Sequence, residues 1–356
     1  MDFGFDAEQE QLRATAERVL AASSPLALAR AAHDDPDAWR EPWKTIVDLG
    51  WTGMAVPENH GGLGLGVVDV VGLAEITGRW MLPAPFVTTV GLATPALVAV
   101  GAAAALEMVA AGRVATLAAS APGAPPAARI DDGRLHGVHL AVPDATRADT
   151  LVVVADRGGA TVAVAVEADR PGVRVEPVWS IDPTRPLASI HLDGVAIAPA
   201  AVVAIEAQVI DAALAALAAE LVGVADRILE IAVDHARGRH QFGQAIGAFQ
   251  GVKHRLADGY VAIERARTLA YNAAMVLDDA GTGPGERSMA AAMAKAAASE
   301  AAVAVAKAAI QVHGALAITW EHDLHLLARR ARQSALCLGD HTWHYRRVAE
   351  LYAGAR

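Results

Sequence analysis

Residues 239–242 combine side chains that suit recognition of a phosphorylated, aromatic ligand. The Arg239 guanidinium is planar and presents several N–H donors together, which matches the geometry of phosphate oxygens. Gln241 can form a hydrogen bond at the same place, and Phe242 offers a face on which a flat ring can stack. Taken as isolated residues, they also fit a structural interpretation, in which Arg239 caps helix-end carbonyls and Phe242 lies in the core.

Other reactive side chains are too sparse to predict a metal centre. Five histidines gather near the C-terminus, but no cysteine or carboxylate spacing completes a ligand set around them, and we predict no metal. These are His313, His322, His325, His341 and His344. The single cysteine, Cys337, excludes an internal disulfide framework. The glycine-rich residues 61–64 are best interpreted as a sharp turn between helices.

Composition sets the broad class of the protein. The chain has 356 residues, of which 54% are hydrophobic and 20% charged, and this favours folding over disorder. A formal net charge of -10 excludes a generally basic binder of nucleic acid or anionic membranes. The first residues are acidic, with no basic flank before an apolar core, and no stretch demands a bilayer, so we expect a cytoplasmic protein.

Hydrophobic periodicity divides the chain into three zones. Helical spacing predicts an α-helical domain over residues 1–112, which opens with a capping-box pattern at Asp6 and Gln9. Strand-like alternation predicts a small β domain over residues 113–204, and helical spacing returns over residues 205–356 as a bundle. The clearest expected strands are residues 134–142, 150–155, 161–166 and 189–195, and the expected bundle helices are residues 209–237, 251–280, 285–314 and 340–352.

Short motifs along nearly the whole chain resemble those of the acyl-CoA dehydrogenase family. The bundle zone matches two family patterns, R-x-x-F-G-x-x-I-x-x-F-Q-x-x-x-x-x-L-A-D from Arg239 to Asp258 and Q-x-x-G from Gln311, followed by Glu321. The first zone matches at Leu49 to Trp51, Val56 to Gly64, Gly78 to Arg79 and Pro83 to Pro85. The resemblance implies an α+β fold: a helical N-domain, a small β-barrel-like middle domain and a C-terminal four-helix bundle.

The resemblance also implies FAD as cofactor. In the family, the matching arginine and phenylalanine reach the FAD of a neighbouring subunit, as do the glutamine and glycine pair of the second motif. Carried over to this sequence, the expected contacts to the adenine and pyrophosphate side are Arg239, Gln241, Phe242, Gln311, Gly314 and Ala315.

The catalytic base that the family needs is missing from both of its usual positions. An acyl-CoA dehydrogenase removes the α-proton with a carboxylate in a dry pocket while the β-hydride passes to the flavin. In most relatives that glutamate lies 27 residues beyond the motif glutamine, which here is Leu338. In others it lies 26 residues before the motif arginine, which here is Ala213. We therefore predict no intact catalytic residue.

The expected ring side of the flavin site also departs from the family. Relatives carry a T-E-P-x-A-G-S-D segment and a W-I-[TS] strand against the flavin ring, whereas this chain has A-S-A-P-G-A-P-P over residues 119–126 and G-V-H-L-A-V-P over residues 137–143. The sequence thus keeps the adenine half of the site and lacks the ring half.

Three hypotheses follow from this asymmetry. In the first, the chain is the non-catalytic subunit of a heteromeric, α2β2 acyl-CoA dehydrogenase of the actinobacterial type, some of which act on CoA thioesters of steroid side chains, and it shares FAD with a paralogous subunit. In the second, it is a self-sufficient homo-oligomer with a relocated base, Asp340 first, then Glu220 and Glu264. Those carboxylates also fit structural roles: Asp340 as a helix cap and Glu264 paired with Arg265 or Arg267. In the third, it is a flavin-free scaffold.

Overall fold

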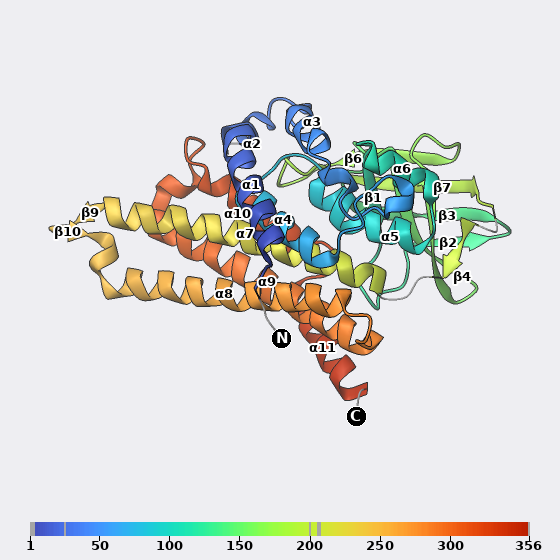
Figure 1. Cartoon of the computed structure of the whole chain (residues 1–356). Helices are drawn as coiled ribbons and strands as arrows, with labels where there is room; N and C mark the ends of the chain where they lie inside the picture. Colours follow the sequence, from blue (N-terminus) through green and yellow to red (C-terminus); the bar gives the residue numbers. More distant parts are fainter. Residues whose placement is uncertain (1–3, 25, 199–200, 205–207, 355–356) are drawn as a thin grey trace.

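The computed structural model describes residues 4–24, 26–198, 201–204 and 208–354, and Figure 1 shows its three parts in sequence order. The first part is helical, and α1 begins at the predicted capping box. The Asp6 carboxylate accepts hydrogen bonds from the backbone N–H groups of Glu8 and Gln9, while the Gln9 side chain accepts one from the Asp6 N–H. Its helices are α1 (Ala7–Ser23), α2 (Leu26–Ala31), α3 (Arg40–Asp48), η1 (Trp51–Gly53), η2 (Glu58–His60), α4 (Val67–Arg79), the π-helix η3 (Val87–Ala93), α5 (Thr94–Ala99) and α6 (Ala103–Ala110).

The second part is a mixed β-sheet with the hydrogen-bonded order β6-β7-β3-β2-β4-β5-β8, and β1 pairs with β4 in parallel. The four predicted strands are confirmed within a few residues as β3, β4, β5 and β7. The sheet closes over its own core, to which β4 and β5 contribute buried valines. The strands are β1 (Ala115–Ala118), β2 (Ala128–Asp131), β3 (Arg134–Pro143), β4 (Thr150–Arg157), β5 (Ala160–Glu167), β6 (Val173–Val178), β7 (Leu187–Ala196) and β8 (Val203–Ala204).

The third part is the helical bundle. Its long helices are α7 (Gln208–Gly238), α8 (Gln250–Asp278) and α9 (Pro284–His313), followed by η6 (Gly314–Ile318), α10 (Leu324–Leu336) and α11 (His341–Gly354). A small hairpin of β9 (His240–Gln241) and β10 (Gln244–Ala245), followed by η5 (Ile246–Ala248), connects α7 to α8. The hairpin projects from one end of the bundle, and the sheet lies at the opposite end of the molecule (Figure 1). The predicted divisions after residues 112 and 204 stay predictions.

Helix α10 is not among the four predicted bundle helices. Its inward face carries Arg330, Gln333 and Ser334, which are buried, so polar residues interrupt the apolar spacing by which a core helix is predicted. Burial is possible because residues from other parts of the chain pair with the Arg330 charge and form hydrogen bonds with Gln333 and Ser334. The sequence of the helix alone does not identify these partners.

Among the described residues, one helical stretch, Pro284–Ile318, reaches the length and apolar character of a membrane span. In the fold it includes α9, which packs against α7, α8, α10 and α11. Its composition is therefore that of the central helix of a bundle, whose alanines allow its neighbours to approach closely.

Two glycines bring α4 and α7 into close contact. A Cβ at Gly223 would lie 1.9 Å from the Glu75 carbonyl oxygen, and a Cβ at Gly78 would lie 2.2 Å from the Glu220 carbonyl oxygen. Neither position accepts a side chain without moving a helix backbone. This contact joins the N-terminal helices to the bundle beside Glu220.

Candidate functional site

The first group of predicted cofactor residues lies on and beside the hairpin that links α7 to α8. Arg239 and Gln241 are exposed, and the Phe242 ring is 91% exposed. The interpretation of Phe242 as a core residue is therefore wrong. Phe242 has a φ of 55°, a left-handed conformation that is unfavourable for a bulky residue and is found more often where function requires it.

The second group lies at the end of α9. Gln311 is exposed on its last turn, Gly314 caps the helix with a φ of 66°, and Ala315 is exposed in η6. The rings of His235 on α7 and His313 on α9 stack with their centroids 4.1 Å apart. Since His235 is one helical turn before Arg239, this contact brings both predicted groups to the same end of the bundle.

Of the two segments expected beside the flavin ring, residues 137–143 line a cavity of about 410 Å³ between β3 and the end of α10. Ala141 and Pro143 of β3, Leu336 of α10 and Cys337 just after it are among its lining residues. Trp179, which is 85% exposed, and Ser334 also line it, and its charged lining residues in the described chain are arginines. The other segment, residues 119–126, lies against α11, where the Pro122 carbonyl oxygen accepts a hydrogen bond from Trp343. The cavity therefore contains only one of the two segments that the sequence indicated, and none of its described lining residues is a carboxylate.

The two usual base positions hold no proton acceptor in the fold either. Ala213 is fully buried on α7, and Leu338 is half-buried in the α10–α11 connection with a φ of 56°. The nearest relocated candidate, Asp340, caps α11, because its Oδ1 accepts a hydrogen bond from the Trp343 backbone N–H at 2.8 Å. Glu264 forms an ion pair with Arg267 on the bundle surface.

Glu220, the remaining candidate base, lies in a buried network of charges. Its carboxylate accepts two hydrogen bonds from Arg185, one of them 2.7 Å long, and one of 3.0 Å from Arg330 Nη1. The Ser334 hydroxyl donates to it at 3.1 Å. Arg330 also forms an ion pair with Asp182. The network joins the loop after β6 to α7 and α10, and all of these side chains are at least nine-tenths buried.

The electrostatics of this network make Glu220 a poor base. Burial alone would raise the pKa of Glu220, but the guanidinium groups of Arg185 and Arg330 outweigh burial and hold this pKa below its ordinary value. An effective general base near neutral pH needs the opposite shift and a free lone pair. Sequence reasoning missed Asp182, Arg185 and Arg330, because no local pattern distinguishes them from charged residues on the surface.

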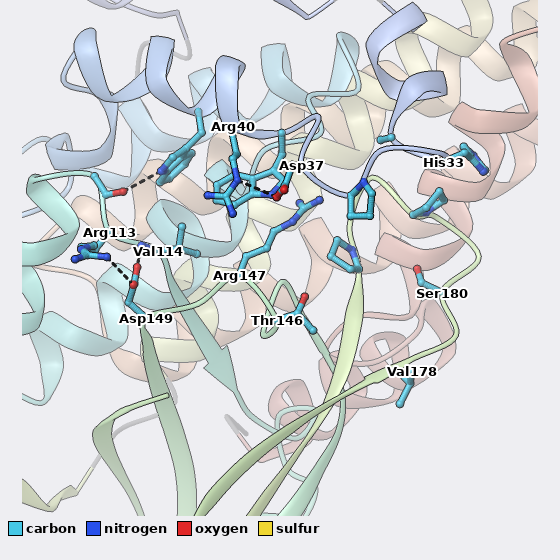
Figure 2. Close-up of a pocket in the computed structure, with 17 residues that line it drawn as sticks. His33, Asp37, Arg40, Arg113, Val114, Thr146, Arg147, Asp149, Val178 and Ser180 are labelled. Carbon is cyan, nitrogen blue, oxygen red and sulfur yellow. Dashed lines mark hydrogen bonds and ion pairs between the residues drawn. The ribbon is translucent and has the colours of Figure 1, made fainter. Parts of the chain in front are cut away.

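The network continues toward a second cleft, of about 780 Å³, between α3 and the sheet (Figure 2). Arg147 lines this cleft and donates from Nη1 to Asp144 at 3.0 Å and to the carbonyl oxygens of Pro83 and Thr184. Its guanidinium lies 5.1 Å from the centre of the Trp39 ring. None of the predicted site residues line this cleft. Figure 2 shows two of its other arginines paired with aspartates, Arg40 with Asp37 and Arg113 with Asp149.

A buried lysine holds the connection in which the base would be expected. The Lys295 ammonium on α9 donates to Ser299 Oγ at 3.0 Å and to the carbonyl oxygens of Ala335 and Gly339 at 3.0 and 3.1 Å. Burial lowers the pKa of Lys295 to about 8. Because its partners are backbone carbonyls on both sides of Leu338, its role is to fix the α10–α11 connection.

The residues at the hairpin end fit the adenine and pyrophosphate side of FAD. The exposed Arg239 guanidinium forms no ion pair among the described residues and can donate to a phosphate. The Phe242 ring lies in a T-shaped contact with Phe249 but is largely exposed, so a flat ring can stack on it. The Glu220 network is about 27 Å along α7 from its end at Gly238, at 1.5 Å per residue. Arg185 belongs to that network and also lines the β3–α10 cavity, so the cavity and the hairpin are well separated within one chain.

Comparison with known proteins identifies the family of the chain. Residues 6–110 match the family model "Acyl-CoA dehydrogenase, N-terminal domain" and residues 205–352 match "Acyl-CoA dehydrogenase, C-terminal domain". The chain is 32% identical over 337 residues to acyl-CoA dehydrogenase IpdE2 of Mycobacterium tuberculosis, covering 93% of each chain. It is 34% identical to acyl-CoA dehydrogenase FadE34 of the same organism over 90% of this chain, which spans 43% of that longer protein.

Solved structures show the same fold over nearly the whole chain. The ChsE4–ChsE5 complex of Mycobacterium tuberculosis superposes with a TM-score of 0.88 at 26% identity, covering 99% of each chain. The Tcur3481–Tcur3483 steroid ACAD G363A variant superposes with a TM-score of 0.85 at 29% identity, covering 98% of each chain. These findings confirm the predicted α+β fold and the predicted family, with FAD as the family's cofactor. The chain belongs to the acyl-CoA dehydrogenase family of FAD-dependent oxidoreductases that act on acyl-CoA thioesters.

Proposed function

We propose that this chain is the non-catalytic subunit of a heteromeric acyl-CoA dehydrogenase. In this role it supplies adenine-side contacts to an FAD that it shares with a paralogous subunit. The observation that supports this most directly is the state of its carboxylates. Asp340 caps a helix, while Glu220 and Glu264 are bound to arginines. Each carboxylate considered as a base thus has a structural role.

The reaction of the family needs a carboxylate base, so the lack of a free carboxylate at the considered positions bears on which subunit removes the proton. Oxidation of the acyl-CoA breaks two C–H bonds, since a carboxylate takes the α-proton and FAD, when bound, accepts the β-hydride. A base must lie within hydrogen-bond reach of the α-carbon proton and be deprotonated but unpaired. Leu338 and Ala213 cannot accept a proton, so we assign proton removal to the partner subunit. The contribution of this chain is to bind and orient the cofactor.

The hairpin end supports a shared cofactor. The β9–β10 hairpin projects from the end of the bundle that lies opposite the sheet (Figure 1). Arg239, Gln241 and Phe242 lie on or beside this hairpin, and with Gln311, Gly314 and Ala315 they form the proposed adenine-side site. Exposed apolar side chains accompany them: Leu316 and Ile318 of η6 are 44% and 70% exposed, and Tyr260 and Val261 of α8 are 56% and 66% exposed. Such a surface suits contact with another subunit.

The relatives indicate the type of partner and substrate. One solved relative is a complex of two named chains, ChsE4 and ChsE5, and another is titled a steroid ACAD. By similarity we propose an α2β2 assembly with a paralogous acyl-CoA dehydrogenase subunit, acting on an acyl-CoA with a bulky polycyclic group. We also propose a cytoplasmic location.

The flavin content of the purified protein tests the proposal. We expect no flavin absorbance from the chain alone, and about one FAD per pair of unlike chains after co-expression with a paralogue encoded beside it. Arg239→Ala should lower the FAD retained by the complex, because it removes the donor for the pyrophosphate. Arg237→Ala is the matched control, since Arg237 is exposed two residues earlier and pairs with Asp234. One FAD per chain in the isolated protein would contradict the shared site.

The alternatives make different predictions for the same measurements. A self-sufficient enzyme with Asp340 as its base requires turnover by the chain alone, which Asp340→Asn would abolish. Under the proposed function, Asp340→Asn affects only the start of α11 and costs little, because asparagine caps a helix about as well as aspartate. If the chain is a flavin-free scaffold, the native complex and the Arg239→Ala complex should retain the same amount of flavin.

A further inference from the structure

Three histidines form a contact cluster beneath the proposed adenine-side site. His235 lies on α7, His313 on the last turn of α9, and His322 in the connection from η6 to α10. The His235 and His313 rings stack with centroids 4.1 Å apart, and the His322 ring meets His313 edge-on at 4.8 Å. His313 is 8% exposed, whereas His235 and His322 are half-buried and reach the surface.

The hydrogen bonds within the cluster leave one buried nitrogen without a partner. His313 Nδ1 lies 2.8 Å from the Ala309 carbonyl oxygen, so this nitrogen carries the proton and donates it. His313 Nε2 is buried and has no hydrogen-bond partner among the described residues. A buried polar atom of this kind is costly unless something outside the chain satisfies it. When Nε2 is protonated, it becomes a donor that needs an acceptor.

The surroundings of the cluster favour an anion as that acceptor. The groups that act electrostatically on His235 are His322 and Arg239, and those that act on His313 are His235 and His322. Of the nearby carboxylates, Asp323 pairs with Arg30 and Asp234 pairs with Arg237. The exposed Glu321, next to His322, is not among the groups that act on His235 or His313. The described residues contain no group of His, Cys, Asp and Glu able to hold a metal ion. Among the described residues, no carboxylate therefore acts as a countercharge to His235 or His313 if these rings become protonated.

We propose that His235, His313 and His322 form the floor of the adenine-side site and bind the diphosphate of the cofactor together with Arg239, taking up a proton from solvent as it binds. This inference rests on the proposed function, because it places the adenine diphosphate at the hairpin end. It adds the residues that hold the diphosphate and makes binding dependent on pH.

The direction of the pH dependence follows from the state of the free chain. Burial, followed by the neighbouring positive charges, lowers the pKa of His235. Burial also lowers the pKa of His313, with smaller contributions from His235 and His322. Both are therefore neutral in the free chain at pH 7. A bound dianion raises the pKa of these groups, so affinity increases as pH falls from the bound-state pKa toward the free-state pKa.

The test uses the full chain and ADP-ribose as the probe. Both of its phosphates keep one charge between pH 6 and 8, so any pH dependence in this range belongs to the protein. We expect the Kd measured by calorimetry to rise by at least about tenfold from pH 6 to 8, because one linked proton changes the affinity by up to tenfold per pH unit. Histidine-selective NMR should show that ADP-ribose shifts the ring signals of His235 and His313. In His235→Gln the dependence should flatten, and His136→Gln in β3 should match the unmodified chain.

Variants separate this inference from the proposed function. Binding that needs Arg239 but has the same Kd at pH 6 and 8, with unshifted histidine signals, would overturn the histidine site and leave the adenine-side site intact. Binding that is unaffected by Arg239→Ala, or no binding up to millimolar ADP-ribose, would overturn both. His313→Asn, whose amide can still donate to the Ala309 carbonyl, keeps the test meaningful if another substitution unfolds the chain.

Discussion

Removal of the charge on Glu220 should destabilise the whole arrangement of domains. In Glu220→Gln, an amide replaces the carboxylate that accepts from Arg185 Nη1 at 2.7 Å and from Arg330 Nη1 at 3.0 Å. One amide oxygen can still accept, but the amide nitrogen then faces guanidinium donors. Arg330 keeps Asp182 as its partner, whereas the nearest remaining carboxylate oxygen to Arg185 is that of Asp144, at 4.0 Å. One buried guanidinium thus loses its main countercharge.

The magnitude follows from the burial of these groups. Glu220 and Arg330 are 1% exposed and Arg185 is 6% exposed, so solvent cannot replace the lost partner. Breaking a buried ion pair by removing one partner costs about 3–5 kcal/mol. Glu264→Gln is the matched control: its carboxylate is 41% exposed and pairs with Arg267, and a surface pair of this kind contributes about 1 kcal/mol or less.

Urea unfolding followed by circular dichroism measures the effect at pH 7. We expect a lower midpoint for Glu220→Gln with a similar dependence on urea, and a near-native midpoint for Glu264→Gln. Because the folded-state pKa of Glu220 is depressed, its contribution is present above the unfolded value of 4.5 and is lost as pH falls below it. The difference between native chain and variant should therefore shrink in acid. A native midpoint combined with loss of turnover would refute the structural role and make Glu220 a base.

Two further predictions concern packing and the α10–α11 connection. Gly223→Ala should destabilise the chain by about 3 kcal/mol or more, since its Cβ would lie 1.9 Å from the Glu75 carbonyl oxygen. Gly251→Ala is the control and should be neutral or slightly stabilising, because a Cβ there meets nothing within 4 Å. Equal thermal midpoints of the two variants would contradict this prediction. Lys295 has a folded-state pKa of about 8, below its ordinary value of 10.5. Between pH 8 and 10.5 the unfolded chain therefore binds more protons than the folded chain, and the free energy of unfolding should rise by about 3 kcal/mol over this range. Lys295→Met should lack that rise in urea titrations at pH 8 and 10.5, and an identical rise in both proteins would show that Lys295 does not titrate as described.

Local sequence signals predicted much of the secondary structure, because they depend on neighbours along the chain. The capping box at Asp6 and the alternation in β4 and β5 are of this kind, and both appear in the structure. Helix α10 was not predicted, since Arg330 and Gln333 look like surface residues until Asp182 and the Arg185 carbonyl are placed against them. Those partners lie some 150 residues earlier, and spacing carries no information about such contacts.

The sequence by itself determined the family, and it predicted the cofactor-side motif and the missing base, since each depends on residue identities at counted positions: Arg239 and Phe242 are present, and Leu338 stands where a glutamate is expected. Only the tertiary structure decided whether another carboxylate could act in its place. Glu220 is a plausible base in the sequence and an arginine-bound structural residue in the fold. The tertiary structure also placed His235 of α7 against His313 of α9, two residues that are 78 positions apart in the sequence. Charge and hydrogen bonding act over a few ångströms in space, so the role of an ionisable side chain depends on contacts that only folding creates.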